Sequence, residues 1–179
     1  MAYEDSAASG LSIGKYLIRR LQDYGIRTVF GIPGVHTVEL YRGLAGSSIR
    51  HTTPRHEQGA GFMAAGYARA SGRVGVCMVT SGPGATNTVT PIRDSLADSI
   101  PIVVICGQVP TNVIGTDAFQ EAPVSAIMGS VAKHVFLVTD PHQLEATVRT
   151  AFEIAAMGRP GPVVIDVPKD VQNWVGEFQ

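Results

Sequence analysis

Glu57 is the residue of this sequence with the clearest chemical potential, because it is a lone carboxylate at the head of a small and apolar segment. The segment reads TPRHEQGAGFMAAGYAR, from 53 to 69, and residues 58–63 contain no cation. A carboxylate near a helix N-terminus often only stabilises the helix dipole, by about 0.3 to 1 kcal/mol. Without an ion-pair partner it can also share a proton with a ligand nitrogen. Both interpretations stay open at this point.

A glycine-rich turn is the second candidate place for chemistry. The letters SGPGATN, from 81 to 87, follow an apolar run and include Gly82, Pro83, Gly84 and Asn87. The turn lacks both the lysine of GxxxxGK[ST] and the spacing of GxGxxG, which disfavours a phosphate-binding loop. Two alternatives remain: a tight turn into a closely packed helix, or a backbone that closely approaches a flat, uncharged ligand.

The histidines and cysteines disfavour metal and hydrolase chemistry. The histidines at 36, 51, 56, 134 and 142 form no HxxxH pair, and no serine, histidine and aspartate share the spacing of a known triad. Cys77 and Cys106 lie inside the apolar runs VGVCMVTS and PIVVICGQV, where a thiol acts as a small buried hydrophobe. We predict structural roles for both cysteines and no metal site made by this chain alone.

The composition restricts the partners. Of the 179 residues, 45% are hydrophobic and only 16% are charged, which suits one domain with a substantial core and a surface that meets other protein. The formal net charge of -1 and the lack of a basic run disfavour nucleic acid. No apolar stretch reaches the roughly 18 residues that span a membrane, and MAYEDSAASG does not resemble a signal peptide. We therefore expect a cytoplasmic protein.

Alternating helical and strand patterns predict the elements that position these residues. The predicted strands lie in RTVFGI, IRHTTP, VGVCMVTS, PIVVIC, HVFLVT and PVVIDVP. Helical patterns occupy LSIGKYLIRRLQDYG, EQGAGFMAAGYARASG, GATNTVTPIRDSLADS and PHQLEATVRTAFEIAAMG. Several strands are apolar on both faces, which is typical of a parallel sheet covered on both sides by helices. The predicted fold is an α/β fold, a three-layer α/β/α domain with a mainly parallel six-stranded sheet.

The candidate residues follow the ends of these strands. Pro33 and Gly34 follow TVFGI, Glu57 follows IRHTTPRH, and the glycine-rich turn follows GVCMVTS. The letters GTDAFQE lie beyond PIVVICGQV, in an irregular stretch from 111 to 130 that is predicted to be an active-site loop. Ligands of open parallel sheets gather beyond the carboxyl ends of the strands. We therefore predict that these residues meet at one edge.

Five blocks of the sequence together resemble one family. VFGIPG, RHEQGAGFMAAGYARASG, VTSGPGATNTVTPIRDSLADSIPIVVICGQV, GTDAFQE and RPGPVVIDVPKDVQ are similar, in order and spacing, to the N-terminal pyrimidine-binding domain of thiamine-diphosphate enzymes of the acetolactate synthase and 2-oxo acid decarboxylase family. The resemblance extends over nearly the whole chain, so residues 1–179 are expected to be one such domain. It implies thiamine diphosphate as cofactor and a 2-oxo acid as substrate.

The same resemblance implies roles for single residues. Glu57 matches the family's glutamate, which hydrogen-bonds N1′ of the aminopyrimidine and favours the tautomer that activates the cofactor. Gln120 would face the reacting carbon, so Glu57 and Gln120 are the implied catalytic residues, and Phe119 would line the substrate channel. The implied cofactor-binding residues are Pro33, Gly34, Glu57, Thr80, Pro83 and Asn87.

Two departures from the acetolactate synthase pattern leave the reaction open. Ile32 stands where acetolactate synthases typically have tyrosine, and Val35 and His36 replace the small residues usual after the glycine. The stretch IPGVHTVELYRGL is more similar to the decarboxylases, including the guanidino-oxopentanoate type. The expected reaction is therefore decarboxylation of a 2-oxo acid, with or without carboligation.

The family's diphosphate-binding domain has no counterpart in this sequence. That domain carries a GDG motif and a later asparagine, which hold Mg²⁺ and the diphosphate, and the sequence contains no GDG. We therefore expect the N-terminal part of a longer enzyme, inactive alone, that meets the diphosphate-binding domain of a neighbouring subunit in a homo-oligomer, either a dimer or a tetramer. The alternatives are a separate subunit of a two-chain decarboxylase and a noncatalytic assembly module.

Overall fold

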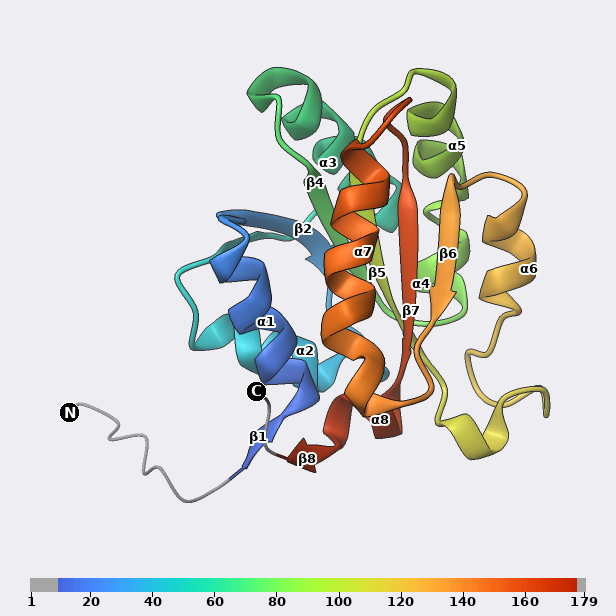
Figure 1. The fold of residues 1–179 in the computed structure, drawn as a ribbon. Coiled ribbons are helices and arrows are strands. Elements are labelled where there is room, and N and C mark those ends of the chain that lie inside the picture. The colour runs from blue at the N-terminus through green and yellow to red at the C-terminus, as the bar shows by residue number, and fades with distance from the viewer. Residues whose placement is uncertain (1–9, 177–179) are drawn as a thin grey trace.

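Six strands form one parallel sheet in the computed structural model, which describes residues 10–176 (Figure 1). Their order across the sheet is β3-β2-β4-β5-β7-β6, and every pairing within it is parallel. The strands are β2 (Thr28–Ile32), β3 (Arg50–Thr52), β4 (Gly75–Val79), β5 (Ile102–Gln108), β6 (His134–Leu137) and β7 (Val163–Pro168). The predicted six-stranded sheet is confirmed.

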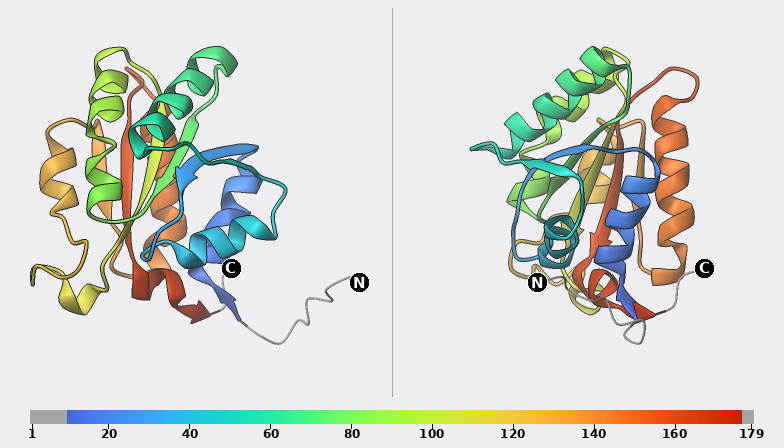
Figure 2. Two further views of the ribbon diagram at one scale, coloured as in Figure 1. Left: turned by 180° about the vertical axis from the view of Figure 1, so that it is seen from behind. Right: turned by 90° about the vertical axis from the view of Figure 1, so that its left-hand side faces the viewer.

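Helices cover both faces of this sheet, as the edge-on view in Figure 2 shows. One layer contains α1 (Ile13–Asp23), α2 (Val38–Ala45) and α7 (Leu144–Ala156). The other contains α3 (Glu57–Ser71), α4 (Pro83–Thr86), α5 (Val89–Ala97) and α6 (Val124–Gly129). Shorter elements are η1 (Thr111–Val113), η2 (Pro141–Gln143), α8 (Lys169–Asn173) and the antiparallel pair of β1 (Leu11–Ser12) with β8 (Val175–Gly176). The β1–β8 pair is not among the predicted strands.

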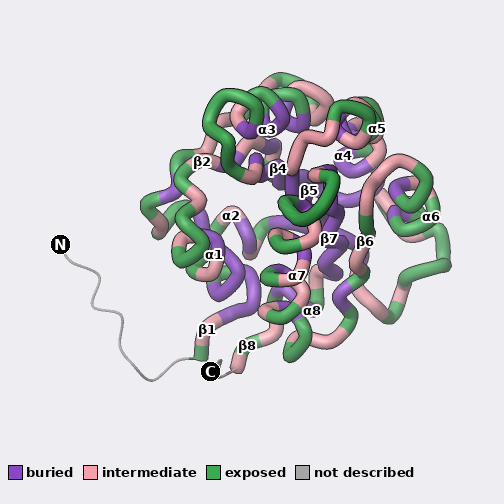
Figure 3. The backbone as a smooth tube through the Cα atoms, turned by 45° about the horizontal axis from the view of Figure 1, so that its top comes forward, coloured by how far each residue is buried: buried purple, intermediate pink, exposed green. Residues whose placement is uncertain are grey.

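The strands in the middle of the sheet are buried on both faces (Figure 3). In β4, Met78 belongs to the core on the α1 and α7 side, whereas Cys77 belongs to the core on the α3 side. Cys77 and Cys106 are both fully buried free thiols. These strands are apolar on both faces because helices cover both faces of the sheet, as predicted. Both cysteines lie in the core.

Small residues bring α3 close to the sheet and so place its first residue, Glu57. A Cβ added to Gly75 of β4 would lie 2.1 Å from the carbonyl oxygen of Ala64 in α3. A Cβ added to Gly61 would lie 2.4 Å from Cγ of Pro91 in α5. Larger side chains at these positions would push the helix outward, because protein interiors are close-packed.

The segment GATNTVTPIRDSLADS forms two helices rather than the single predicted one. α4 ends at Thr86, and α5 begins at Val89 after a break at Asn87 and Thr88. Pro91 supplies the physical reason, because it has no N–H to donate to the carbonyl of Asn87 and its ring would clash with that carbonyl in a continuous helix. The break places Asn87 at the end of α4, where its side chain contacts Glu57.

None of the helices in the described part of the chain is long and apolar enough to cross a membrane. The irregular stretch from 111 to 130 contains only η1 and α6, joined by residues without regular structure. The segment with Gln120 is thus a loop, as predicted, and it leads into α6 on the same face of the sheet as α3 and α4.

Candidate functional site

The predicted site residues follow three neighbouring strands of the sheet. Pro33 and Gly34 come directly after β2, Thr80 comes directly after β4, and Glu57 begins α3 a few residues beyond β3. Because β2 pairs in parallel with both β3 and β4, the carboxyl ends of these three strands lie at one edge. This is the edge at which open α/β sheets bind ligands.

Thr80 packs the turn after β2 against the turn after β4. A Cβ added to Gly34 would lie 2.5 Å from Cβ of Thr80, and one added to Gly84 would lie 2.7 Å from its Cγ2. Real Cβ atoms do not approach this closely, so both turns need glycine at these positions. Thr80 itself is buried, whereas Pro33 and Pro83 are exposed. Thr80 therefore fixes the spacing of the turns, and the two prolines form the accessible surface of the site.

Glu57 and Asn87 are in direct contact. Nδ2 of Asn87 donates a hydrogen bond to Oε2 of Glu57 at 3.0 Å, and the backbone N–H of Asn87 donates to the carbonyl oxygen of Pro83 at 3.0 Å. Among the described residues, no salt bridge includes Glu57 and no hydrogen bond reaches its Oε1. One carboxylate oxygen is thus held in place, and the other is left to accept a ligand N–H or to share a proton.

Two uncharged side chains, Cys77 and Tyr41, lie close enough to this carboxylate to feel its charge. Burial raises the pKa of the Cys77 thiol to about 12, with the negative charge of Glu57 as the second cause. Burial also raises the pKa of Tyr41, and the charge of Glu57 contributes there too. The Tyr41 hydroxyl donates to the carbonyl oxygen of Met78 at 2.8 Å, and its ring packs against His51 at 5.0 Å. Cys77 and Tyr41 therefore stay protonated near neutral pH and form an uncharged wall beside Glu57.

The neighbouring histidines have structural partners. His56 caps α3, because its Nδ1 accepts a hydrogen bond from the backbone N–H of Gln58 at 3.1 Å. His36 is buried, with Nδ1 2.5 Å from Oγ of Ser81, and its carbonyl oxygen accepts from Nε2 of Gln172 at 2.7 Å. Burial lowers the pKa of His36, and the positive charge of Lys169 lowers it further. His36 is therefore a neutral residue that ties the two glycine turns to α8.

Gln120 reaches the same turn through its backbone. A Cβ added to Gly82 would lie 2.4 Å from the carbonyl oxygen of Gln120. Both residues have positive φ values, 54° at Gly82 and 59° at Gln120, and a positive φ is uncommon for a residue with a side chain. The adjacent residue, Phe119, is 73% exposed. Within the described residues no hydrogen bond joins Gln120 to Glu57. Gln120 lies against Gly82 and Glu57 binds Asn87, so residues 82–87 link the two predicted catalytic residues.

The residues at this edge fit an aminopyrimidine. A ring nitrogen that shares a proton needs one partly buried carboxylate without an ion-pair partner, and Glu57 meets that requirement. The closely packed glycine turns leave backbone rather than side chains beside it. In residues 10–176, no group of three or more His, Cys, Asp or Glu side chains is arranged to hold a metal ion. The fit therefore concerns the pyrimidine part of the cofactor.

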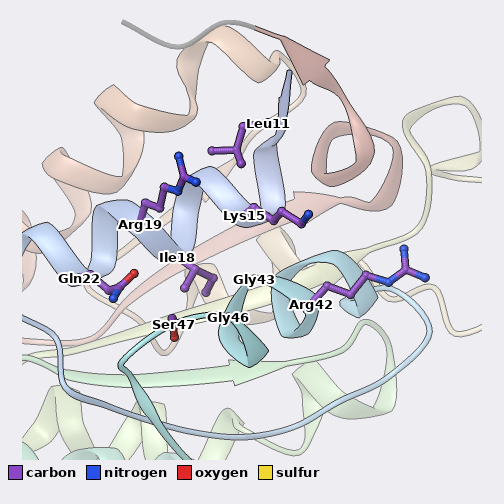
Figure 4. Close-up of a pocket in the computed structure, with 9 residues that line it drawn as sticks. All are labelled: Leu11, Lys15, Ile18, Arg19, Gln22, Arg42, Gly43, Gly46 and Ser47. Atoms are coloured by element: carbon purple, nitrogen blue, oxygen red, sulfur yellow. The ribbon is translucent and has the colours of Figure 1, made fainter. Parts of the chain in front are cut away.

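A separate hollow of about 220 Å³ lies between α1 and α2 (Figure 4). Its cations come from both helices, and one of them, Arg42, forms a salt bridge with Glu39. The hollow is on the layer opposite α3 and α4, and its lining includes no predicted site residue. The lining residues are Leu11, Lys15, Ile18, Arg19, Gln22, Arg42, Gly43, Gly46 and Ser47.

Two buried polar residues near the site, Gln108 and Asp166, were missed by the sequence analysis. Gln108 ends β5 and donates a hydrogen bond from Nε2 to Oδ2 of Asp166 in β7 at 2.9 Å. Burial raises the pKa of Asp166 from 3.8 to about 7, although the hydrogen bond from Gln108 opposes this. The sequence indicates them only by a single polar residue near the end of each apolar run, Gln108 in PIVVICGQV and Asp166 in PVVIDVP.

The raised pKa of Asp166 predicts how stability depends on pH. The folded protein binds this proton more tightly than the unfolded chain, so the favourable contribution is complete below pH 3.8 and is lost as pH rises through about 7. At about 1.4 kcal/mol per pKa unit, the wild type should lose about 3 kcal/mol more than Asp166→Asn between pH 5 and pH 8. Urea unfolding of both chains at each pH measures this difference, and parallel pH profiles would contradict the prediction.

The fold and the site together define a cofactor-binding α/β domain whose binding edge presents one unpaired carboxylate. Residues 11–128 match the family model described as thiamine pyrophosphate enzyme, N-terminal TPP binding domain. The chain belongs to this family. The resemblance that the five sequence blocks indicated is therefore confirmed.

Acetolactate synthases are among the similar curated proteins. The acetolactate synthase large subunit of Corynebacterium glutamicum is 50% identical over 174 residues, which cover 97% of this chain and 28% of that protein. The chloroplastic acetolactate synthase of Arabidopsis thaliana is 51% identical, with 88% of this chain and 25% of that protein covered. The acetolactate synthase of Mycobacterium bovis is 52% identical, with 92% of this chain and 27% of that protein covered. The chain spans about a quarter of the length of these relatives.

Proposed function

We propose that this chain supplies the pyrimidine-binding half of the active site in a thiamine-diphosphate-dependent enzyme that decarboxylates a 2-oxo acid, with or without carboligation. The observation behind this proposal is the Glu57 carboxylate, held on one oxygen by Asn87 at 3.0 Å and free of any salt bridge among the described residues. Membership of the family and the names of the acetolactate synthase relatives support it. We expect the enzyme to be cytoplasmic.

In this proposal Glu57 holds and shares a proton at N1′ of the aminopyrimidine. Asn87 restricts rotation of the carboxylate, and the uncharged wall of Tyr41 and Cys77 provides no cation that would fix Glu57 as a permanent ion pair. Thiamine diphosphate, when bound, supplies a carbon centre that adds to the substrate carbonyl and accepts the electron pair left by carbon dioxide. Pro33, Gly34, Thr80 and Pro83 would border the pyrimidine.

We assign Gln120 to the substrate side of the site. Its backbone packs against Gly82, the residue before Pro83, so Gln120 lies at the same edge as the proposed pyrimidine pocket. An amide that donates hydrogen bonds can orient a 2-oxo acid or stabilise negative charge at the carbonyl oxygen. The exposed ring of Phe119 would border the substrate channel.

The rest of the active site would come from other protein. Mg²⁺ and the diphosphate are assigned to a diphosphate-binding domain, contributed by a neighbouring subunit of a homo-oligomer. Exposed apolar side chains on the elements that carry the site residues support a protein-covered face, because exposed apolar surface often marks an interface. They are Val35, Val38, Phe62, Met63 and Phe119.

Calorimetric titration with thiamine diphosphate and Mg²⁺ tests the proposal. The chain would be titrated alone, mixed with a separate diphosphate-binding domain, and fused to the central and diphosphate-binding domains of the Corynebacterium glutamicum relative. We expect weak binding by the chain alone, and tight binding with 2-oxo acid decarboxylation in the fused protein. Activity in the unfused mixture would favour a two-chain enzyme. A folded, assembled fusion without cofactor binding would favour the noncatalytic module and overturn the proposal.

A further inference from the structure

We infer that Asp166 and Gln108 are a buried positioning pair, which holds the segment with Gln120 against the glycine-rich turn. The importance of that segment for catalysis rests on the proposed function, whereas the anchoring itself is a property of this chain. The pair lies on the α3 side of the sheet, because the neighbouring residues Val164 and Cys106 belong to the core on that side. It sits directly below the loop that enters α6.

Gln108 links the sheet to the loop. Its Nε2 donates to Oδ2 of Asp166 at 2.9 Å and to the carbonyl oxygen of Ala122 at 3.3 Å, and its Oε1 accepts from the backbone N–H of Val109 at 2.9 Å. The amide therefore uses both N–H groups and its oxygen, and Gln108 is almost completely buried. Ala122 lies two residues after Gln120, so this bond fixes the backbone where the loop leaves the site.

Asp166 is one of three partners that select the orientation of the Gln108 amide, together with the Ala122 carbonyl and the Val109 N–H. An amide can rotate by half a turn and exchange its oxygen with its NH₂ group, and the surrounding hydrogen bonds select the orientation. The acceptor Oδ2 keeps the NH₂ group directed toward β7 and Ala122. A rotated amide would place Oε1 against the Ala122 carbonyl oxygen, and the two oxygens would repel each other. Loss of the Asp166 acceptor removes one of the three hydrogen bonds that oppose this rotation and so loosens the anchor at Ala122.

The segment needs an anchor because part of its backbone is in an unfavourable conformation. Gln120 has a φ of 59° and lies against Gly82, and such residues keep their conformation only when the surroundings enforce it. At the other end of the segment, the backbone N–H of Thr111 donates to Oδ1 of Asp170 at 3.0 Å. The two ends are thus tied to residues in or directly after β7, and the buried end is tied by Gln108 and Asp166.

Simple core packing does not explain this pair. Asp166 is almost completely buried, and its Oδ1 has no hydrogen-bond partner among the described residues. A buried oxygen without a partner is unfavourable, and an apolar side chain of similar volume commonly packs better at such a place. A carboxyl group at this position therefore calls for another role, and orientation of the Gln108 amide supplies one.

Hydrogen exchange of the 179-residue chain, followed by mass spectrometry, tests the inference. Asp166→Asn keeps an acceptor for Gln108, whereas Asp166→Leu keeps the branched shape, with a larger volume, and has no acceptor. We expect amides 111–122 to exchange at least about tenfold faster in Asp166→Leu than in Asp166→Asn. The exchange rates of amides 102–107, in β5, should differ much less between the two variants. Val164→Ala is the matched control, because it opens a cavity on the same face of β7 and keeps both hydrogen-bonding side chains of the pair. It should not loosen residues 111–122 selectively.

Gln108→Met is the second variant, in case Asp166→Leu does not fold. It removes both donors and should expose the same amides selectively. The inference would be overturned if amides 111–122 exchanged equally fast in the wild type, in Asp166→Asn and in Asp166→Leu or Gln108→Met. It would also be overturned if exchange increased uniformly across the sheet. If both apolar variants fail to fold, exchange of the Gln108 side-chain NH₂ protons in the wild type is measured instead. The inference requires this exchange to be slow, and fast exchange overturns it. None of these readouts needs cofactor, so they separate the inference from the proposed function.

In the fused protein the positioning role predicts a particular kinetic pattern. Asp166→Leu should lower kcat at least about tenfold and leave the Kd for thiamine diphosphate within about twofold, because Glu57 and Asn87 are untouched. Asp166→Asn should restore kcat. Loss of cofactor affinity and kcat together, without rescue by asparagine, would indicate general unfolding and contradict a positioning role.

Discussion

Glu57→Gln is expected to lower thiamine-diphosphate-dependent turnover of the fused protein at least about 100-fold, the scale of a lost proton-transfer group. Glutamine keeps the length of the side chain, and its amide oxygen can still accept the bond from Asn87. It cannot share a proton with a ring nitrogen as a carboxylate does. The free energy of unfolding should change by less than about 1 kcal/mol, because only a helix-dipole contribution is lost. Steady-state kinetics and urea unfolding of the same samples measure both quantities.

Glu145→Gln is the matched control for this prediction. Glu145 also lies in the first turn of a helix, α7, on the opposite layer of the domain. The same loss of charge should leave turnover within about twofold of the wild type. Equal turnover of Glu57→Gln and the wild type would show that Glu57 only stabilises its helix, which is the simpler interpretation of its position.

Gly82→Ala is expected to destabilise the chain by about 3 kcal/mol or more, because backbone strain and overpacking each cost about 1 to 3 kcal/mol. Gly82 has a φ of 54° and a ψ of -115°, a conformation that side chains rarely adopt. Its new Cβ would also lie 2.4 Å from the carbonyl oxygen of Gln120, so the Gln120 segment must move. Urea unfolding measures the loss, and exchange of amides 111–122 reports the movement.

Gly72→Ala separates these two causes. Gly72 ends α3 with a φ of 68°, and an added Cβ there would meet no atom within 4 Å. Only the conformational cost of about 1 kcal/mol should remain. If the two variants lose the same stability and leave the loop equally protected, the close contact between Gly82 and Gln120 has no energetic importance.

The layer order and the place of the site follow from patterns in the amino-acid sequence. Runs such as GVCMV and IVVIC are apolar on both faces of the strand, and only a sheet covered on both faces buries such strands completely. Strand ends then locate Pro33, Gly34, Glu57 and Thr80 at one edge, because parallel strands share their direction. The motif blocks identified the family that the comparison confirmed.

The contacts between residues distant in the chain depend on the folded arrangement and have no counterpart in the sequence patterns. Asn87 binds Glu57 across 30 positions, and Gln108 binds Asp166 across 58, distances at which no sequence period relates two side chains. The break between α4 and α5, which presents Asn87 to Glu57, depends on Pro91 and on the packing of α3 against α5. A buried polar residue acquires its role from the partner that packing places beside it, because only that partner determines its hydrogen bonds, its pKa and its orientation.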